Sequence, residues 1–498
     1  MLTNATTPNS PEWWLLRLGQ RLEDERPGLE RLDSYWRGDH PLPFGHRKRR
    51  EAYRKFQRMA RTNFAALIAE ALLERLRVVG FRAGSDEDAK VDKKAWSWWQ
   101  ANDMDSVSGL VHRAAVVMKR AYVFVGPNPD GGKEPLVTGE DPRQVIHEES
   151  PRNRRKILAV LKTWWDDVEN RHYAVVFVGG QVHYYQAKRR ESDTDKYLWM
   201  ATQWEVERPA EDNPLGEPPV VVFRNRPDLC GNCLGEFEDV TDIQDRINTQ
   251  VLDRLVISTM QAYRQRYATG VDITDANGNP SAGFDPGADL LWTVPDDKAR
   301  FGDFAAADLT GVLNSVEADI AHIGSITRTP PHYLVGRIVN AAGEALAAAE
   351  TGLCAKTMER LTEYSASWEQ VYRLAGKLIG EEIPQDAEVM WADPQFRSLT
   401  EKAAASVQLV AAGVPWRTRM TILDFTPQEI ARMVTERTQD AMLEAALAPP
   451  MQQQGGVGRS PAQSNGNGGT VSMRNGPGSG QGRAAAPQAA LARNGSGG

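Results

Sequence analysis

The sequence has 498 residues, enough for two to four domains with a hydrophobic core in each. Hydrophobic residues make up 41% of it and charged residues 25%, and no segment approaches the ~18 uninterrupted apolar residues of a membrane span. Its net charge of −7 argues against an outer surface that binds DNA tightly, because such binding depends on lysine and arginine neutralising phosphates.

The first 80 residues are predicted to be mainly helical. Pro11 and Pro27 suit the first turns of helices. A later helix is predicted to begin after Asn63, which can cap it, and to end at Gly80. Its apolar residues recur with helical spacing: Phe64, Leu67, Ile68, Ala71, Leu72, Leu76 and Val79. Another helix is expected over residues 106–120.

From residue 122 to residue 226 the apolar residues follow the pattern of β-strands. Runs rich in β-branched and aromatic residues predict strands at 122–125, 157–165, 173–178, 182–186, 197–204 and 220–223. Gly179-Gly180 separates two of these runs and suits a two-residue hairpin turn. The predicted fold class is therefore α+β.

Two long amphipathic helices follow, with a turn-rich insert between them. The first helix has apolar residues four positions apart on one face: Ile243, Ile247, Val251 and Leu255. The second has one apolar stripe: Leu309, Val312, Leu313, Val316, Ile320 and Ile323. Pro330 and Pro331 end it. The insert contains Asp275–Pro280 and Asp285–Gly287, which predict turns in a small β-rich projection.

A third long helix is predicted to begin at Asn340, with Glu344 favourably placed in its first turn. Its apolar residues keep a helical spacing: Leu361, Tyr364, Trp368, Val371, Ala375 and Leu378. Helices are also expected over 399–412 and over 427–447, the latter after the capping segment Asp424–Pro427. Residues 448–498 are rich in Gly, Ser, Asn, Gln, Ala and Pro, a composition that predicts a disordered tail.

Seven short segments between residues 12 and 445 carry a family resemblance. They are Tyr35–Pro43, Arg75–Phe81, Trp164–Asp167, Asp245–Asn248, Thr329–Gly336, Asn340–Leu346 and Trp391–Pro394. In this order they resemble the portal proteins of tailed double-stranded DNA phages, in particular those of long, non-contractile-tailed phages that infect actinobacteria.

The resemblance implies a division of the chain into the parts of a portal subunit. These are an N-terminal α+β wing domain (1–235), stem helices (236–268 and 305–330), a β-rich clip between them (269–304), a tunnel loop (331–340), a long kinked wing helix with its following segment (341–398), a helical crown (399–447) and the disordered tail (448–498).

The resemblance also implies a function. Portal proteins form a ring, of twelve subunits in virions, at one capsid vertex, and DNA is packaged and ejected through it. Enzymatic activity, cofactors and membranes are then not expected. The implied partners are further copies of the chain, double-stranded DNA, the large terminase, the major capsid and scaffolding proteins and a head–tail adaptor. The implied location is the virion, after assembly in the host cytoplasm.

Twelve residues become candidates for the channel and the docking surface. The channel-lining acids are Glu238, Asp242, Asp245 and Glu317, whose charge would repel the DNA backbone. The tunnel-loop residues are Val335, Arg337, Ile338 and Asn340, where Arg337 either contacts phosphates or pairs with an acid such as Glu344. The clip docking residues are Asp275, Asn277, Asn279 and Asp285. We also expect Val316 and Ile320 to contact a neighbouring subunit, because the apolar stripes are broader than one helix pair needs.

No pattern predicts a catalytic or metal site. Gly231–Gly235 has the outline of a nucleophile elbow with cysteine, but it does not directly follow a strand. Cys230 and Cys233 have no second cysteine pair and no suitably spaced histidines for zinc, so packed thiols in a glycine-rich joint are preferred. Acidic pairs such as Asp166-Asp167 suit solvated turns better than magnesium, and no phosphate-binding loop of an ATPase occurs.

Three further observations bear on compartment and contacts. Three cysteines suit a reducing compartment, and the first ten residues lack the features of a signal peptide. The basic run Arg47–Arg50 suits a solvated helix face better than a DNA contact. Trp96, Trp98 and Trp99 suit a core or subunit contact better than ligand stacking.

Two other functions remain open from the residues. One is a phage hydrolase that acts on DNA or cell wall and carries a helical arm. It would need a convergent acid, base or metal set, and the sequence shows none. The other is a capsid or scaffold-like structural protein, which the helix pair around a short insert argues against.

Overall fold

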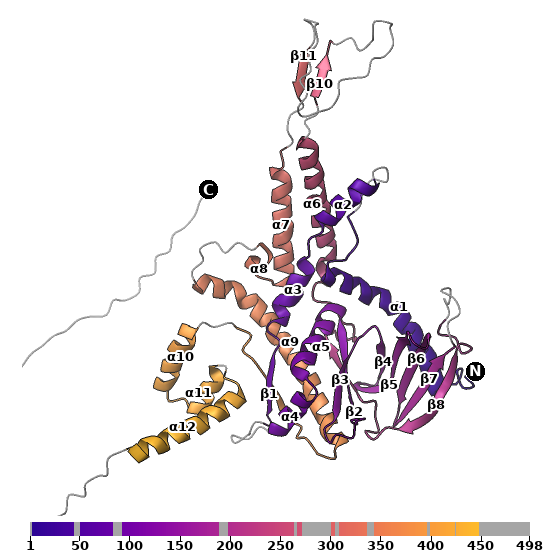
Figure 1. Cartoon of the computed structure of the whole chain (residues 1–498), viewed down its shortest axis with the longest axis vertical. Helices are drawn as coiled ribbons and strands as arrows, with labels where there is room; N and C mark the ends of the chain where they lie inside the picture. The colour runs from indigo at the N-terminus through magenta and orange to yellow at the C-terminus, as the bar shows by residue number, and fades with distance from the viewer. Residues whose placement is uncertain are drawn as a thin grey trace, which may run out of the picture. The chain divides into compact units, whose positions relative to one another are not determined.

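The computed structural model describes residues 2–43, 50–82, 92–188, 198–262, 266–270, 300–303, 308–335, 343–395, 399–423 and 425–447 (Figure 1). The fold is α+β, as predicted. The chain divides into two compact units, residues 1–436 and 437–498. Most of the predicted clip, the second half of the predicted tunnel loop and the whole predicted tail lie outside the described residues.

The N-terminal half begins with a long helix, α1 (Pro11–Arg37), which Ser10 caps by accepting a hydrogen bond from the Trp13 amide. Gly38 ends it in the left-handed conformation, φ 73°. Pro27 lies inside α1, so the prediction that it begins a helix was wrong. One uninterrupted helix runs past it without the hydrogen bond that a backbone amide at position 27 would donate.

Two shorter helices follow, α2 (Arg50–Ala60) and α3 (Phe64–Leu73). The predicted cap is confirmed, because the Asn63 side chain accepts from the Ala66 amide at 3.0 Å. The predicted end at Gly80 was wrong. Helix α3 ends at Leu73, and strand β1 (Val78–Arg82) pairs antiparallel with β12 (Glu388–Trp391), more than 300 residues further along the chain.

The sheet region contains two antiparallel sheets. The larger has the order β4-β5-β6-β7-β8, formed by Val145–Ser150, Asn153–Asp166, Arg171–Val178, Gln181–Ala187 and Trp204–Asp212. The smaller has the order β3-β2-β9, formed by Leu136–Glu140, Arg120–Gly126 and Val220–Arg224. The predicted hairpin at Gly179-Gly180 joins β6 to β7, and Gly179 takes a positive φ of 59° there. The strand predicted at 197–204 was wrong in position, since β8 begins at Trp204.

Helices cover both sheets. Helix α1 packs its apolar face, with Trp14, Leu15, Leu18 and Leu22, on buried residues of the five-stranded sheet. Helices α4 (Lys93–Ala101) and α5 (Met104–Met118) join the main core, and α5 packs on β2 of the smaller sheet. A small third cluster, formed by Tyr122, Val145, Val160, Val220 and Val222, lies where the two sheets face one another. Together these layers form the body of the first unit.

The second half is mainly helical. Its elements are the short 3-10 helix η1 (Glu238–Val240), α6 (Thr241–Ala262), β10 (Arg266–Thr269), β11 (Arg300–Asp303), α7 (Thr310–Thr327), α8 (Pro331–Val335), α9 (Gly343–Leu378), α10 (Leu399–Ala411), α11 (Trp416–Ile422) and α12 (Pro427–Leu447). Helices α6 and α7 lie side by side, and β10 pairs with β11 in the segment that connects them (Figure 1). Helix α9 packs on β9 and β2 with the predicted apolar face, which includes the fully buried Tyr364 and Trp368. None of the helices in the described ranges is long and apolar enough to cross a membrane.

Candidate functional site

The base of α6 is anchored to α1 through the segment Asp245–Asn248. The Tyr35 hydroxyl donates to the Asp245 carboxylate at 2.8 Å. Burial, together with this hydrogen bond, raises the pKa of Tyr35 to about 12. Ile247 is fully buried in the main core. One turn of α6 therefore contributes both a polar and an apolar contact to the body.

Asn248 is the centre of a buried hydrogen-bond network. Its side-chain oxygen accepts from the Thr62 amide at 2.9 Å and from the Thr62 hydroxyl at 2.8 Å. Its nitrogen lies 2.7 Å from Nε2 of His40, which stacks on Tyr35 with ring centroids 4.8 Å apart. Gln244, one turn earlier, accepts from the Phe64 amide at 2.9 Å. Two backbone amides at or just before the start of α3, those of Thr62 and Phe64, thus donate to side chains of α6.

A carboxylate joins α6 to α7. Asp319, on α7, accepts two hydrogen bonds from Arg246, at 2.9 Å from Nε and 2.6 Å from Nη2. It accepts a third at 3.0 Å from Nε2 of Gln250. Asp319 is buried, while about half of the Arg246 side chain is exposed. Such a bidentate pair fixes the register of the two helices as well as their separation.

The two ends of the α6–α7 pair meet on one face of α9. Glu236, just before η1, is buried and lies 3.3 Å from Nζ of Lys356 and 3.4 Å from Nε of Arg360. Lys356 also donates to the backbone oxygen of Thr327, the last residue of α7, at 2.8 Å. A cavity of about 340 Å³ adjoins these residues. On its wall, burial raises the pKa of Glu363 to about 7, against the attraction of Arg360.

A second buried cation ties α3, α8 and α9 together. Nη2 of Arg75 lies 3.2 Å from Glu350 and donates to the Tyr333 hydroxyl at 3.2 Å. His332 lies 3.5 Å from the same carboxylate. The start of the predicted tunnel loop is therefore held to the body by charged groups.

Five of the seven segments that carry the resemblance contact one another. Tyr35–Pro43 meets Asp245–Asn248 through the contacts of Tyr35 and His40. Arg75–Phe81 meets Thr329–Gly336 through Arg75, and it meets Trp391–Pro394 through the pairing of β1 with β12. These contacts form two groups, one between the end of α1 and the base of α6, and one that joins the segment after α3 to α8 and to β12.

The four predicted channel acids lie in two different environments. Asp242 and Glu317 are exposed, although Asp242 lies 3.7 Å from Arg31. Glu238 and Asp245 are partly buried and are bound by their own chain, Glu238 to Lys119 at 2.8 Å and Asp245 to Tyr35. The structure does not bring the four together into one cluster.

Most of the other predicted site residues are outside the described part of the chain. Val335 is exposed at the end of α8. Arg337, Ile338 and Asn340 of the tunnel loop lie outside the described residues, as do Asp275, Asn277, Asn279 and Asp285 of the clip. Their predicted roles remain predictions.

The expected subunit contact through Val316 and Ile320 needs correction. Val316 is buried against the chain's own core, and Ile320 is partly buried on the same cluster. The large apolar residues that α7 leaves exposed are Leu313 and Ile326. The stripe is used mainly by α7 to pack within its own subunit.

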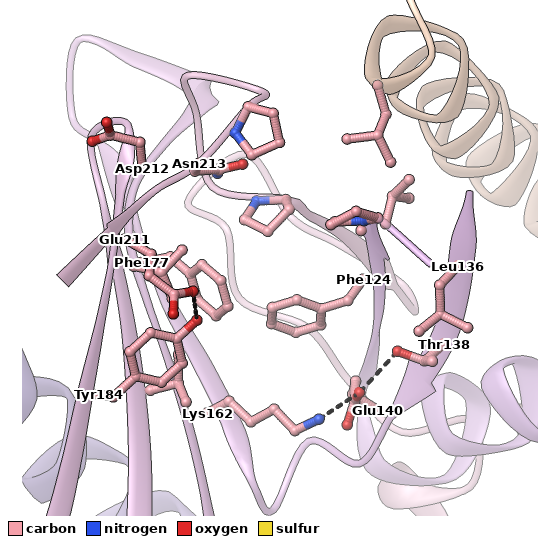
Figure 2. Close-up of a pocket in the computed structure, with 18 of the residues that line it drawn as sticks. Phe124, Leu136, Thr138, Glu140, Lys162, Phe177, Tyr184, Glu211, Asp212 and Asn213 are labelled. Atoms are coloured by element: carbon pink, nitrogen blue, oxygen red, sulfur yellow. Dashed lines mark hydrogen bonds and ion pairs between the residues drawn. The ribbon is translucent and has the colours of Figure 1, made fainter. Parts of the chain in front are cut away.

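The body contains an apolar cleft of about 630 Å³ between the two sheets (Figure 2). Phe124 and Phe177 face it from opposite sheets, with ring centroids 5.3 Å apart. At one rim Lys162 donates to Glu140 at 2.7 Å, and at the other the Tyr184 hydroxyl donates to Glu211 at 2.8 Å. Both polar pairs are satisfied within the chain.

The cysteines show no sign of chemistry. All three thiols are free, and Cys230 is exposed. Burial raises the pKa of Cys233, which disfavours the reactive thiolate. In the residues that the structure covers, no group of three or more His, Cys, Asp and Glu side chains could hold a metal ion.

Two other predictions can be compared with the structure. Trp98 and Trp99 are buried in the main core, and Trp96 packs against it, which confirms the core interpretation. Of the basic run Arg47–Arg50, residues 47–49 lie outside the described residues.

Sequence reasoning missed a second basic run, Arg152–Lys156, at the tip of the β4–β5 hairpin. All five residues are exposed. The run is interrupted by Asn153 and merges into a strand, so it did not stand out as a block of charge. The five residues are exposed because they lie at the tip of the hairpin, and the sequence pattern does not show this position.

Known proteins resemble the chain over most of its length. The sequence model of a family described as "Phage portal protein, SPP1 Gp6-like" matches residues 17–441. A portal protein of Mycobacterium phage D29 is 28% identical over 375 residues, which are 71% of this chain and 73% of that protein. A portal protein of Mycobacterium phage L5 is 26% identical over 377 residues, 72% and 74% of the two chains. A chain from the virion of a native gene transfer agent particle matches with a TM-score of 0.41 and 12% identity, over 72% of this chain and 87% of that one.

Proposed function

The chain belongs to the phage portal protein family of the SPP1 Gp6-like type, and we propose that twelve copies of it form the ring at one capsid vertex through which double-stranded DNA is packaged and ejected. In this role the protein provides a channel whose shape and wall charge let DNA pass, and it catalyses no reaction. The proposed partners are the large terminase, the major capsid and scaffolding proteins and a head–tail adaptor. The proposed place of assembly is the host cytoplasm.

The observation that supports this function best is the anchored pair α6 and α7. Each helix contacts the other through the Arg246–Asp319 pair, and both ends of the pair are held by Lys356. The 22 residues of α6 span about 33 Å. A helix pair of this length, held to the body at its base, suits the wall of a channel that must keep its shape while DNA moves through it.

The subunit is proposed to carry the parts of a portal in chain order. Residues 1–235 form the wing, 236–268 and 305–330 the stem, 269–304 the clip, 331–340 the tunnel loop, 341–398 the long wing helix with its following segment, 399–447 the crown and 448–498 a disordered tail. The α+β body and the α6–α7 pair support the first two assignments.

Within the bore, the exposed acids Asp242 and Glu317 are proposed to face DNA and to repel its phosphates. Glu238 and Asp245 contribute less free charge in this proposal, because Lys119 and Tyr35 already bind them. Arg337 is proposed to make brief, salt-screened contacts with phosphates from the tunnel loop. The clip residues Asp275, Asn277, Asn279 and Asp285 are proposed to dock the terminase and the adaptor.

Native mass spectrometry of the purified chain tests the ring, and electron microscopy along its axis tests the channel. A closed ring of about a dozen copies is expected. A monomer that hydrolyses DNA or cell wall would instead support the hydrolase alternative.

The variant Arg337→Glu tests the tunnel loop, with Arg337→Lys as the control that keeps the charge. Rings should assemble with both, and Arg337→Glu should package less DNA, with a defect that changes with ionic strength. Full-length packaging at wild-type yield by Arg337→Glu would remove Arg337 from the DNA contact.

A further inference from the structure

The tip of the β4–β5 hairpin carries uncompensated positive charge. Arg152, Arg154, Arg155 and Lys156 place four cations in five residues, all exposed. No ion pair joins any of these four to an acid among the residues that the structure describes. We call these four residues the basic tip.

The acids nearest in sequence to the basic tip are already bound by other cations. Glu148 pairs with Arg21 of α1, and Glu149 pairs with Arg224 of β9. The tip also extends beyond the rest of the sheet, because the pairing of β5 with β6 begins only at Ala159. Arg152, Arg155 and Lys156 are therefore exposed without a paired acid among the described residues, whereas Arg154 also lines a cavity that it shares with Glu148 and Glu149.

The opposite edge of the same sheet is acidic. Among the strands that the structure describes, β8 pairs with β7 alone, and after Trp204 every residue of it is exposed. Four of them are carboxylates, Glu205, Glu207, Glu211 and Asp212, and the single guanidinium of Arg208 pairs with Glu211 at 3.2 Å, which leaves Glu205, Glu207 and Asp212 in excess. Figure 2 shows Glu211 and Asp212 at the rim of the apolar cleft. We call these four carboxylates the acidic edge.

The basic tip and the acidic edge cannot meet within one chain. They belong to opposite edges of a five-stranded sheet, which is about 19 Å across. Opposite charges at two edges of one subunit can pair with each other between copies of the chain. The copies must then contact one another head to tail. A head-to-tail contact that closes on itself produces a ring.

We propose that the basic tip of each subunit binds the acidic edge of the next copy of the chain. This inference rests on the proposed function, in which the chain forms a ring. It names one contact between adjacent subunits of that ring. The charges set the order and direction of the subunits around the ring more than its total stability, because both surfaces are exposed and screened by salt.

Two charge reversals test the proposal. The tip variant carries Arg152→Glu, Arg155→Glu and Lys156→Glu, and the edge variant carries Glu205→Lys, Glu207→Lys and Asp212→Lys. Each variant alone opposes like charges, so its ring fraction in native mass spectrometry should fall on the order of tenfold at low salt. Mixed in equal amounts, the two should form rings again, with equal numbers of both variants, because every contact then joins opposite charges.

A control matched to the tip variant reverses three exposed cations away from both surfaces: Lys93→Glu, Lys133→Glu and Arg417→Glu. Its net charge changes by the same amount as that of the tip variant. It should form rings as the wild type does. Circular dichroism checks that each variant is folded. If a reversal unfolds the subunit, the glutamine variants at the same three positions provide the same comparison.

Three results overturn the proposal. Normal rings from the tip and edge variants alone would contradict it while leaving the proposed function intact. Normal rings from the tip variant that retain less DNA would assign the tip to DNA instead. A wild-type chain that stays monomeric would overturn the proposed function and this inference with it.

Discussion

Asn248 on α6 accepts two hydrogen bonds from Thr62, one from its amide at 2.9 Å and one from its hydroxyl at 2.8 Å. Asn248 is almost fully buried and Thr62 is partly buried, so both hydrogen bonds are partly shielded from water. One amide side chain thus connects α6 to the loop between α2 and α3. Removal of the Asn248 side chain should therefore lower the stability of both segments.

The variant Asn248→Leu should lose about 1–3 kcal/mol of unfolding free energy, because it removes the acceptor of the partly buried Thr62 amide and hydroxyl. Denaturant unfolding followed by tryptophan fluorescence measures the change. Thr249→Ala, at the next and exposed position of α6, is the control and should change little. Equal stability of Asn248→Leu and wild type would show that water reaches Thr62.

The variant Asp319→Ala should loosen α7 from α6, because Arg246 and Gln250 lose their common acceptor. Hydrogen exchange of the α7 amides should become roughly tenfold faster, as expected for the loss of charge-assisted hydrogen bonds. Glu317→Ala removes an exposed carboxylate from the same helix and serves as the control. If both variants exchange alike, the pair contributes nothing to the local stability of α7.

Substitutions on α7 should separate folding from assembly. Val316→Asp should destabilise the subunit by about 3 kcal/mol or more, because the charge would enter the main core. Leu313→Asp, at an exposed position, should leave the subunit folded. Thermal unfolding compares the two, and native mass spectrometry then shows whether Leu313 contributes to the ring. A stable Val316→Asp subunit would contradict the burial of this residue.

Much of the architecture could be predicted because its signals are local. The cap at Asn63, the hairpin at Gly179 and the apolar faces of α6 and α9 each depend on residues within a few turns of one another. Such features follow from spacing and from the conformations that individual residues allow. The α+β class and the helix pair follow from them.

The parts that could not be predicted depend on distant segments. Val78–Arg82 continues the apolar spacing of α3, and only its pairing with Glu388–Trp391 makes it a strand. Strand β8 is acidic and contains a proline, a composition that is unlike an interior strand but suits an exposed edge. Among the candidate site residues, the spacing along α6 placed Asp242 and Asp245 on one face, but Tyr35 binds Asp245 from a helix 210 residues earlier.

The pH dependence of stability should report on the cavity beside α9. Burial raises the pKa of Glu363 to about 7 from an ordinary value of 4.5, so the folded chain keeps a proton that the unfolded chain releases. This contribution is complete below about pH 4.5 and is lost as the pH rises through 7.

Wild type should therefore lose stability between pH 5 and pH 8 relative to Glu363→Gln, which has no proton to release. The difference between the two melting temperatures, followed across this range, isolates Glu363 from histidines that titrate in the same window. Glu317→Gln, at an exposed position of α7, is the control. Parallel profiles for wild type and Glu363→Gln would show that the carboxyl is ionised throughout.

Lys356 affects how the α6–α7 pair transmits mechanical force to the body. Its ammonium holds Glu236 at the outgoing end and the Thr327 carbonyl at the returning end. Part of a force applied to the far end of either helix therefore reaches the body at the same turn of α9. Helix α6 passes the rest to α1 and to the loop before α3 through Asp245 and Asn248, so the two helices are coupled at their base as well as to one another.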